Sequence, residues 1–498
     1  MRKAKALSIA VIILLTLAQT NIWITTLSLP EESKPIIVFD EAHGQWHDSN
    51  KLSMFLEDLR ASYEIVINRE EITWNTLKDA WLLIITNPGD SFSDSEVKAI
   101  KKFLRMGRAL LIMGTYHKYV NVEELNKLIN GSGIKFTKTD VLDDTNYDYK
   151  PYYPLLGIWP DNPVANQIKT GIEKVKYSGC MLEISGEAIP VVQTYETARA
   201  EDINGNVVAE GSLVVAAVAS YLGGWVFAIG GADGFRSDKP YYYVMFDNKA
   251  FALNIIDWLY RATHRVALID LAHGEYFVGS KIANLTSLMK EMGFTVIENT
   301  GTLTESTLAG VDVLILMAPE SDSDLFTDEE IQAIQSFVKN GGVLFIGGPR
   351  GKYWRKSTHQ LNNILTPFNI SLIQSAIIDE TNYDYEPTHP ILYTWADNPI
   401  AQRLGYNVSQ VYYDGCAVKI IGDGPIPILT GDDDTKAVHP EDNVTAIVEG
   451  QEVLGVVVYD LPDGGRIFVT GSAAIFRTYK YKPNFESNYE FILNVLGW

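Results

Sequence analysis

The sequence predicts an α/β protein made of two tandem doubly wound domains, each with a mixed, partly antiparallel extension of its sheet. Short apolar runs alternate with amphipathic segments of helical period, which is typical of a parallel sheet with crossover helices. The same order of segments occurs twice along the chain. The 498 residues, 46% of them hydrophobic, are too many for one ordinary domain and too apolar for a disordered chain.

Each copy is expected to open with a strand, an amphipathic helix and a second strand. In the first copy we expect strands over 36–40, 64–68, 81–85 and 109–114, and helices over 49–60 and from 93 onward. In the second copy we expect strands over 266–270, 295–298, 313–316 and 343–347, and helices over 280–292 and from 327 onward. Ser93 and Thr327 suit the N-cap position, because a hydroxyl oxygen there accepts a hydrogen bond from a free backbone N–H. Right-handed crossovers between such strands give a Rossmann-like sheet.

The later part of each copy is richer in β-type runs. In the first copy, apolar runs over 188–192, 213–221 and 225–230 precede a closing helix, so we expect an antiparallel extension of the sheet there. Residues 143–165 and 379–401 are identical at 14 of 23 positions without a gap, which chance does not produce. The sequence therefore predicts an internal duplication, with copies of roughly 230 residues that match a normal domain size.

The domain boundaries follow from this repeat. Residues 34–263 are predicted to form the first domain and residues 264–498 the second, with almost no linker between them. Residues 1–30 carry Arg2, Lys3 and Lys5 ahead of an uncharged apolar stretch, the layout of a secretory signal peptide or an N-terminal membrane anchor. We therefore expect an extracytoplasmic protein that is secreted or held at the membrane by its N-terminus.

Charge and cysteine content exclude several classes of function. The chain has 62 acidic and 41 basic residues, a net charge of −21, and no basic cluster beyond its N-terminus, so we expect no nucleic-acid binding. Cys180 and Cys416 are the only cysteines, which excludes a disulfide scaffold and any four-cysteine metal site. They correspond across the duplication. A bridge between them would require the two domains to meet at that loop, and two buried thiols are the favoured alternative.

Glycines around one predicted strand carry a resemblance to a known superfamily. Gly341 and Gly342 precede the apolar run 343–347, and Gly348 follows it. Together with the Rossmann-like core, this pattern resembles the class I glutamine-amidotransferase-like superfamily. Within that superfamily, the non-catalytic branch found in gliding-motility and intraflagellar-transport proteins is the most similar. The resemblance covers the N-terminal two thirds of each copy.

The catalytic triad implied by this resemblance is missing where the sequence should carry it. Catalytic members have a Cys directly after that strand, where a helix N-terminus and backbone N–H groups activate the thiol. The corresponding stretches here, 113–116 and 346–349, read Met-Gly-Thr-Tyr and Ile-Gly-Gly-Pro. The His of the superfamily follows a late strand, and the stretches 230–233 and 471–474 contain none. The sequence therefore favours a protein that is not an enzyme.

Polar side chains follow the first strand of each copy and return in a later loop. Asp40 and His43, or Asp270 and His273, stand at the carboxyl end of the strand, the edge where α/β sheets bind ligands. The later loops contribute Asp143, Asn146, Tyr147 and Asp148 in the first copy and Asp379, Asn382, Tyr383 and Asp384 in the second. Convergence of both groups would create one polar pocket for a hydroxylated or cationic ligand. The structural alternative, which we rate higher, is that these residues only cap helices and form Asx turns.

No cofactor is predicted, but two further features leave a divalent cation or a sugar as an alternative ligand. Oxygen ligands alternate at Asp144, Asn146 and Asp148 and at Glu380, Asn382 and Asp384, so a divalent cation stays an alternative, although both runs lack the Gly and the distal Glu of a calcium loop. Aromatic residues gather in the same segments, where they either stack on sugar rings or, as we favour, pack the segment onto the sheet. They are Tyr147, Tyr149, Tyr152, Tyr153, Trp159, Tyr383, Tyr385, Tyr393 and Trp395.

These observations favour a non-catalytic binding or assembly protein of the cell envelope, membrane-associated through its N-terminal segment. Its expected partner is a carbohydrate or a protein of the envelope or of a transporter. The alternative is a metal-assisted or His/Asp-dependent hydrolase that uses Asp40 with His43 and Asp270 with His273. A purely structural role would leave no pocket and would expose apolar patches.

Overall fold

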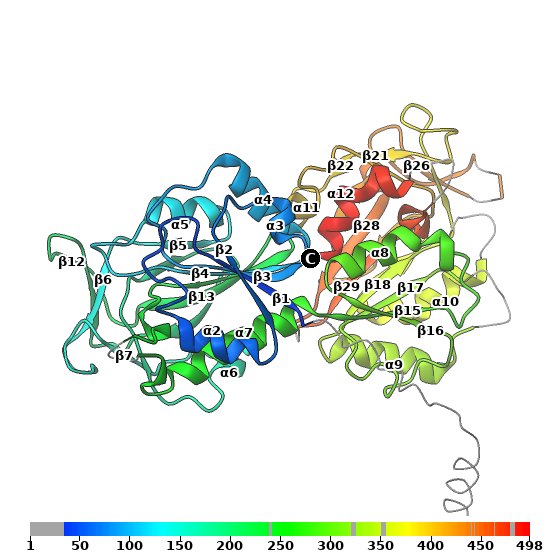
Figure 1. The fold of residues 1–498 in the computed structure, drawn as a ribbon. Coiled ribbons are helices and arrows are strands. Elements are labelled where there is room, and N and C mark those ends of the chain that lie inside the picture. The colour runs from blue at the N-terminus through cyan, green and yellow to red at the C-terminus, as the bar shows by residue number, and fades with distance from the viewer. Residues whose placement is uncertain are drawn as a thin grey trace, which may run out of the picture. The chain divides into compact units, whose positions relative to one another are not determined.

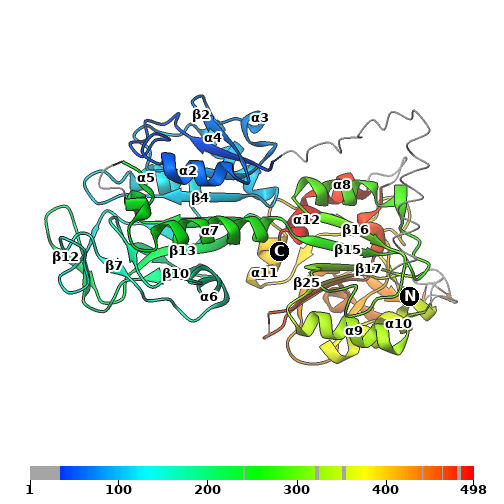
Figure 2. The same ribbon diagram turned by 60° about the horizontal axis from the view of Figure 1, so that its bottom comes forward.

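Two large mixed β-sheets, each with helices on both faces, make up most of the described chain (Figures 1 and 2). The computed structural model describes residues 34–238, 242–319, 325–349, 355–439, 441–442, 444–462, 464–478 and 484–498. The predicted signal or anchor segment, residues 1–30, lies outside this set. Among the described residues, no helix combines the length and the apolar composition needed to cross a bilayer. The predicted α/β class is confirmed.

The first sheet has the strand order β10-β13-β14-β4-β3-β1-β2. Its strands are β1 (Ile36–Asp40), β2 (Glu64–Asn68), β3 (Ala80–Ile85), β4 (Ala109–Met113), β10 (Ile189–Gln193), β13 (Val214–Tyr221) and β14 (Gly224–Ile229). Strands β2, β1, β3, β4 and β14 run parallel, whereas β13 is antiparallel to both β14 and β10. The antiparallel extension expected from the apolar runs is therefore present in the first half.

Helices cover the two faces of this sheet because successive strand residues point to opposite sides. Ile37 and Phe39 pack toward α2 (Ser53–Arg60) and α7 (Asn248–Thr263), whereas Val38 packs toward α4 (Asp94–Arg105) and α5 (Val122–Ile129). In Figure 1, α4 and α5 lie above the sheet, and α2 and α7 lie below it. All residues of β3 and β4 are buried, as expected for parallel strands covered on both faces.

Smaller elements complete the first half. A three-stranded sheet joins β6 (Asp140–Asp143), β11 (Ala198–Glu201) and β12 (Val207–Glu210). Two-strand pairs join β5 (Ile134–Phe136) with β9 (Leu182–Ile184) and β7 (Leu155–Leu156) with β8 (Val175–Lys176). The remaining helices are α3 (Trp74–Leu77), α6 (Pro163–Ile168), η1 (Asp233–Phe235) and η2 (Tyr242–Val244).

The second sheet contains the order β16-β15-β17-β18-β29-β28, and β25 pairs with β28 at its far side. These strands are β15 (Val266–Asp270), β16 (Thr295–Asn299), β17 (Val313–Met317), β18 (Val343–Gly347), β25 (Ile426–Thr430), β28 (Leu454–Asp460) and β29 (Arg466–Thr470). Counted from the edge, this order matches β2-β1-β3-β4-β14-β13-β10 of the first sheet.

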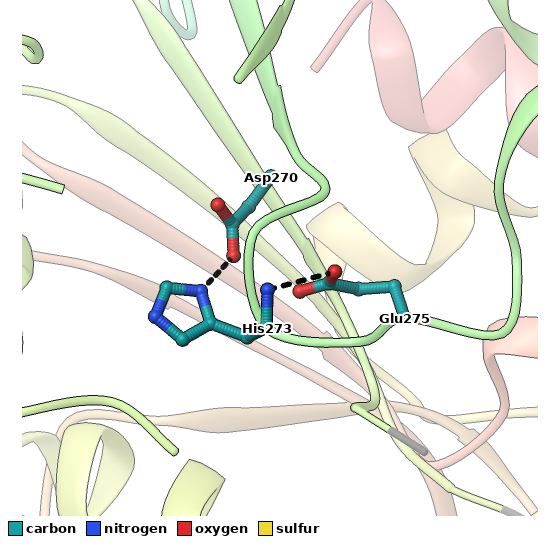
Figure 3. Close-up of side chains that lie close together, drawn as sticks. All are labelled: Asp270, His273 and Glu275. Atoms are coloured by element: carbon teal, nitrogen blue, oxygen red, sulfur yellow. Dashed lines mark hydrogen bonds and ion pairs between the residues drawn. The ribbon is translucent and has the colours of Figure 1, made fainter. Parts of the chain in front are cut away.

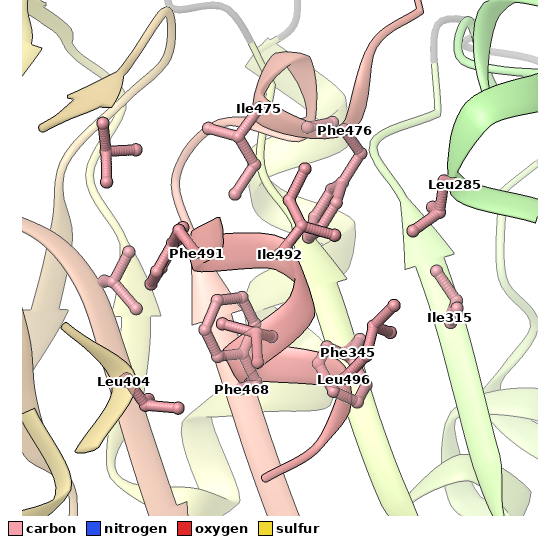
Figure 4. Close-up of a cluster of buried hydrophobic side chains, with 14 of the residues drawn as sticks. Leu285, Ile315, Phe345, Leu404, Phe468, Ile475, Phe476, Phe491, Ile492 and Leu496 are labelled. Carbon is pink, nitrogen blue, oxygen red and sulfur yellow. The ribbon is translucent and has the colours of Figure 1, made fainter. Parts of the chain in front are cut away.

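Helices also cover both faces of the second sheet. Helices α8 (Ala283–Glu291) and α12 (Asn484–Leu496) pack on one face, and α9 (Asp328–Lys339) and α10 (Arg355–Leu365) pack on the other. Figure 4 shows the core under α12, where Phe491 and Ile492 meet Phe345 and Phe468 of two neighbouring strands. The other short elements are α11 (Pro399–Leu404), η3 (Gly279–Lys281), η5 (Thr366–Phe368), η6 (Gly450–Glu452), η7 (Ala473–Phe476), β19 (Ile370–Leu372), β20 (Ala376–Ile378), β21 (Ile391–Leu392), β22 (Thr394–Trp395), β23 (Val411–Tyr412), β24 (Val418–Ile420), β26 (Lys436–Val438) and β27 (Ala446–Glu449).

Two helix starts differ from the prediction, and two match it. Helix α2 begins at Ser53 rather than at residue 49, because Asp48 holds a turn in which its carboxylate accepts the Lys51 N–H and its carbonyl accepts the Leu52 N–H. Helix α8 begins at Ala283 rather than at residue 280, after the short 3-10 helix η3. Ser93 and Thr327 are N-caps of α4 and α9, each within a capping box, as predicted.

Candidate functional site

The predicted pair at the end of β1 forms a buried cluster with a third residue. His43 Nδ1 lies 2.8 Å from Asp40 Oδ2, and His43 Nε2 lies 2.9 Å from Glu96 Oε1. Glu96 belongs to the capping box of α4 and also accepts the backbone N–H groups of Ile72 and Ser93. Asp40 is fully buried and His43 is 5% exposed. The first carboxylate–histidine cluster, Asp40 with His43 and Glu96, therefore ties the end of β1 to the start of α4.

Electrostatics favours a charged imidazole in this cluster. Burial acts to lower the pKa of His43, but the hydrogen bonds and negative charges of Asp40 and Glu96 outweigh it and raise that pKa above the ordinary value. Burial acts to raise the pKa of Glu96, yet the N–H groups of Ile72 and Ser93, together with His43, lower it. The Phe92 ring stacks on the imidazole of His43, with the two ring centroids 3.8 Å apart. An imidazolium held in this way between two carboxylates stabilises the fold.

The second half contains the same arrangement. His273 Nδ1 lies 2.6 Å from Asp270 Oδ2, and His273 Nε2 lies 3.2 Å from Glu330 Oε1, where Glu330 is the capping-box residue of α9. We call Asp270, His273 and Glu330 the second carboxylate–histidine cluster. Glu275 accepts the backbone N–H of His273 at 3.1 Å and lies beside Asp270 (Figure 3).

The second cluster is poorly suited to a metal ion. Asp270, His273 and Glu275 offer ligand atoms within 4.8 Å of one another. However, a metal-bound imidazole needs a free lone pair, and both ring nitrogens of His273 face carboxylates. Burial lowers the pKa of His273, but Asp270, Glu330 and Glu275 together raise it, which favours the protonated ring. A positively charged ring repels a cation.

The later loops form Asx turns. Asp143 Oδ1 accepts the backbone N–H groups of Thr145 and Asn146, both at 2.8 Å, and Thr197 donates its hydroxyl to both carboxylate oxygens. In the second half, Asp379 Oδ1 accepts the N–H groups of Thr381 and Asn382 at 2.8 and 2.7 Å. These contacts are those of the structural alternative.

The remaining polar residues of these loops also have partners within their own half. Asp144 pairs with Arg199 and Asp148 pairs with Lys176, each at 2.5 Å, so their charges are already matched. The amide of Asn382 donates to Asp432, and the backbone N–H of Asp384 donates to the carbonyl of His389. Tyr147 and Tyr383 are both 41% exposed, and each forms a β-bridge to a proline, Pro154 and Pro390. In the first half, two of the three oxygen donors of the possible cation run therefore already face a basic side chain.

A large pocket lies at the carboxyl edge of the first sheet. Its volume is about 1180 Å³, and residues that follow β1, β3, β4 and β14 line it. Side chains lining the pocket include Trp46, His47, Thr115, Tyr116, Lys118, Tyr119, Lys138, Asp140, Tyr152, Tyr153, Ser178, Asp233 and Arg236. This is the edge where the sequence places a ligand site. None of the twelve candidate side chains lines it, although Gly44, Tyr152 and Tyr153 come from the same two segments of the first half.

His47 and Asp233 form the most unusual pair in this pocket. His47 Nε2 lies 3.2 Å from Asp233 Oδ1, and Arg236 also pairs with Asp233, at 3.1 Å. Burial acts to raise the pKa of Asp233, but His47 and Arg236 outweigh it and lower that pKa, so the carboxylate is ionised and accepts the Nε2 proton. His47 is 2% exposed, and its other nitrogen, Nδ1, is buried without a hydrogen-bond partner. A buried polar atom of this kind is rare in a folded protein.

The pocket is lined by residues that follow β4 and β14. In catalytic members of the superfamily that the sequence resembles, the thiol and the His follow the corresponding strands. Thr115 stands two residues after β4, and Asp233 stands four residues after β14. Both cysteines are free and fully buried elsewhere, which confirms the favoured prediction of two buried thiols. Burial raises the pKa of the Cys180 thiol to about 12, and a protonated thiol is a weak nucleophile.

The residues missed by the sequence interpretation are those whose partners are distant in the chain. Glu96 and Glu330 were recognised only as residues of helix starts. His47 follows His43 by four residues, but its partner Asp233 lies 186 residues away. The one available signal was the succession of His43 and His47 after a buried strand. The corresponding loops of the second half include residues 320–324 and 350–354, which lie outside the described residues.

Comparisons with known proteins support the fold of the first half. The family model of the IFT52 GIFT domain matches residues 36–189, and that of a domain of unknown function, DUF4350, matches residues 282–496. No curated protein matches the chain. The predicted resemblance is confirmed in part, by the match of residues 36–189 to the IFT52 GIFT domain.

Similar solved structures include three that each cover less than half of this chain. The mmIFT52 N-terminal domain is 20% identical, covers 45% of this chain and 96% of its own, and has a TM-score of 0.39. A ThuA-like protein from Bacteroides uniformis is 12% identical, with coverages of 47% and 94% and a TM-score of 0.31. Cytoplasmic protein STM1381 from Salmonella typhimurium is 12% identical, with coverages of 45% and 99% and a TM-score of 0.32.

Proposed function

We propose that this chain is an exported, membrane-associated binding protein that recognises a carbohydrate in the pocket of its first half, without catalysis. The observation that carries the proposal is a pocket that is rimmed by aromatic rings and lined by His47, whose Nδ1 is buried without a hydrogen-bond partner. Export and membrane association rest on the basic and apolar pattern of residues 1–30. An envelope or transporter protein is the alternative partner.

The pocket combines the two kinds of surface that a sugar needs. Tyr119 and Tyr152 are 57% and 40% exposed, and their rings offer flat apolar faces. Sugar rings stack on such faces while their hydroxyl groups bind polar side chains. Lys118, Lys138 and Asp140 supply polar groups in the same pocket. The mixed signs of these charges suit a polyhydroxylated ligand better than a highly charged one.

His47 can fix one hydroxyl of such a ligand. When Nε2 donates to Asp233 and the ring carries no second proton, Nδ1 has a lone pair that can accept a hydrogen bond. A ligand hydroxyl that donates to Nδ1 would satisfy the buried nitrogen, whose isolation otherwise costs about 1–3 kcal/mol. The ligand would thereby stabilise the pocket and the fold together.

We also propose that the chain consists of two tandem copies of one Rossmann-like unit, residues 34–263 and 264–498. The matching strand orders of the two sheets support this, and so do the two carboxylate–histidine clusters. The pocket residues diverge, since Ala474 stands in the second copy where Asp233 stands in the first. Sugar binding is therefore assigned to the first copy alone.

Binding can be tested by calorimetric titration of a panel of neutral and acidic oligosaccharides. Tyr119→Ala should weaken binding of the recognised sugar about tenfold, since loss of one stacking ring costs about 1–2 kcal/mol. Tyr149→Ala is the matched control, because Tyr149 is 78% exposed and does not line the pocket. If no sugar binds, or if both variants bind as the wild type does, the carbohydrate proposal is wrong.

A hydrolase is the second candidate, and the same pair favours it. A carboxylate that orients one nitrogen of a pocket-lining His, whose other nitrogen has no hydrogen-bond partner, is an arrangement that a general base uses. The base would be His47 with Asp233, rather than the predicted pairs Asp40 with His43 or Asp270 with His273. Cleavage of a bound sugar or sugar ester that disappears in His47→Ala while binding persists would decide for the hydrolase.

A further inference from the structure

The residue that accepts the backbone N–H of the cluster histidine differs between the two halves. In the first half, Gln45 accepts the His43 backbone N–H at 3.0 Å and donates its amide to Asp40 Oδ2. In the second half, Glu275 accepts the His273 backbone N–H in the same way, beside Asp270. Glu275 has no N–H to donate. Its second oxygen, Oε1, is buried without a hydrogen-bond partner, and the residue is 7% exposed.

The change from amide to acid leaves the second cluster with an excess of negative charge. Among the residues that the structure describes, the titratable groups around Glu275 come from three places: Asp270 from β15, His273 from the same loop and Glu330 from α9. One imidazolium faces three carboxylates there, whereas His43 faces two. Burying an unmatched charge costs several kcal/mol, so such a group takes up a proton or a cation instead.

We propose that Glu275 is protonated at neutral pH, donates a hydrogen bond to Asp270 in place of the Gln45 amide, and makes the second half less stable as the pH rises from mildly acidic to mildly alkaline. A proton suits the site better than a metal ion because His273 has no free nitrogen. A neutral carboxylic acid has nearly the shape of an amide, and the first half shows that an amide fits this position. The proposal concerns the second half and is independent of the sugar pocket.

Burial, and then the charge of Asp270, raise the pKa of Glu275 from 4.5 to about 8, although His273 partly opposes them. The folded chain therefore keeps this proton between about pH 4.5 and pH 8, where the unfolded chain has lost it. In that window the folding equilibrium constant should fall up to tenfold per pH unit, and above pH 8 the contribution of Glu275 should level off.

The test compares Glu275→Gln with the wild-type full chain in denaturant unfolding between pH 5 and pH 9. The two proteins should be nearly equally stable at pH 5. At pH 9 the variant should be more stable, with a folding equilibrium constant higher by about a hundredfold or more. The reciprocal change Gln45→Glu should introduce a similar loss at alkaline pH into the first half. Infrared spectra of the wild type at pH 6 should show a protonated carboxyl band that disappears by pH 9.

Three outcomes would overturn the proposal. The first is parallel pH profiles of the wild type and Glu275→Gln, and the second is a variant that is less stable than the wild type at pH 9. The third is a higher unfolding midpoint with Mn²⁺ or Zn²⁺ in the wild type but not in the variant, which would assign a cation to the site. If the variant fails to fold, the infrared band of the wild type still decides, because its absence at pH 6 means that Glu275 is ionised.

Discussion

Replacing His43 by alanine is expected to lower the free energy of unfolding by about 3–5 kcal/mol, the usual cost of removing one partner from a buried ion pair. His43 is 5% exposed and contacts Asp40 and Glu96 at 2.8 and 2.9 Å. Without the imidazolium, two buried carboxylates lose the one cationic partner that they have among the described residues. The Phe92 ring also loses its stacking partner. Denaturant unfolding at pH 6 measures this loss.

The pH dependence of this loss follows from the raised pKa of His43. A His whose pKa is higher in the folded state stabilises the fold fully below its ordinary value of 6.5, and this contribution fades as the pH rises through the folded pKa. The difference between wild type and His43→Ala should therefore be largest in mildly acidic buffer and shrink at alkaline pH. The exposed His439 provides the control, and His439→Ala should change stability by less than about 0.5 kcal/mol.

A small change in the free energy of unfolding in His43→Ala would mean that His43 contributes to ligand binding rather than to the stability of the fold. In that case the variant would stay near wild-type stability and lose affinity for the sugar. The structure favours the opposite result, because His43 does not line the pocket. Sugar affinity measured on the folded fraction of the variant separates the two explanations.

The sequence predicted the first four strands of each sheet closely, for a physical reason. Parallel strands buried on both faces must be apolar at every position, so runs such as Ala109–Met113 stand out without any knowledge of their neighbours. The starts of α2 and α8 were missed because a turn at Asp48 and a short 3-10 helix at Gly279–Lys281 depend on local hydrogen bonds rather than on periodicity.

The candidate site was predicted less completely, because its partners are far apart in the chain. Asp40 and His43 were identified as polar residues at a strand end. Glu96, which lies 53 residues after His43, binds the second ring nitrogen of His43, so both nitrogens of this buried ring have a carboxylate partner. Asp143 and Asp379, which were candidates for a pocket, hold their own turns, as the structural alternative predicted. Residue type at a strand end predicts the edge where a ligand binds, but not which side chains face it.

Replacing Gly230 by alanine is expected to have an effect as large as that of His43→Ala, for a steric reason. The end of β14 crosses the segment around Cys180 so closely that a Cβ on Gly230 would lie 1.8 Å from the Cys180 carbonyl oxygen. That contact is with backbone, which cannot rotate away. The approach is fixed by the bond from the Cys180 N–H to the Gly230 carbonyl, at 3.0 Å. We expect a loss of more than about 3 kcal/mol in the free energy of unfolding.

The second half has the same close crossing, between the end of β29 and the segment around Cys416. A Cβ on Gly471 would lie 1.9 Å from the Cys416 carbonyl oxygen, so Gly471→Ala should be about as harmful as Gly230→Ala. Gly301→Ala is the control, since its nearest neighbour would be 4.0 Å away, and it should change stability by less than about 0.5 kcal/mol. If the denaturant midpoint of Gly230→Ala equals that of the wild type, the close approach of Gly230 to the Cys180 carbonyl oxygen is contradicted. Because Gly179 and Ser178 of the crossing segment line the pocket, sugar affinity should fall with stability in this variant.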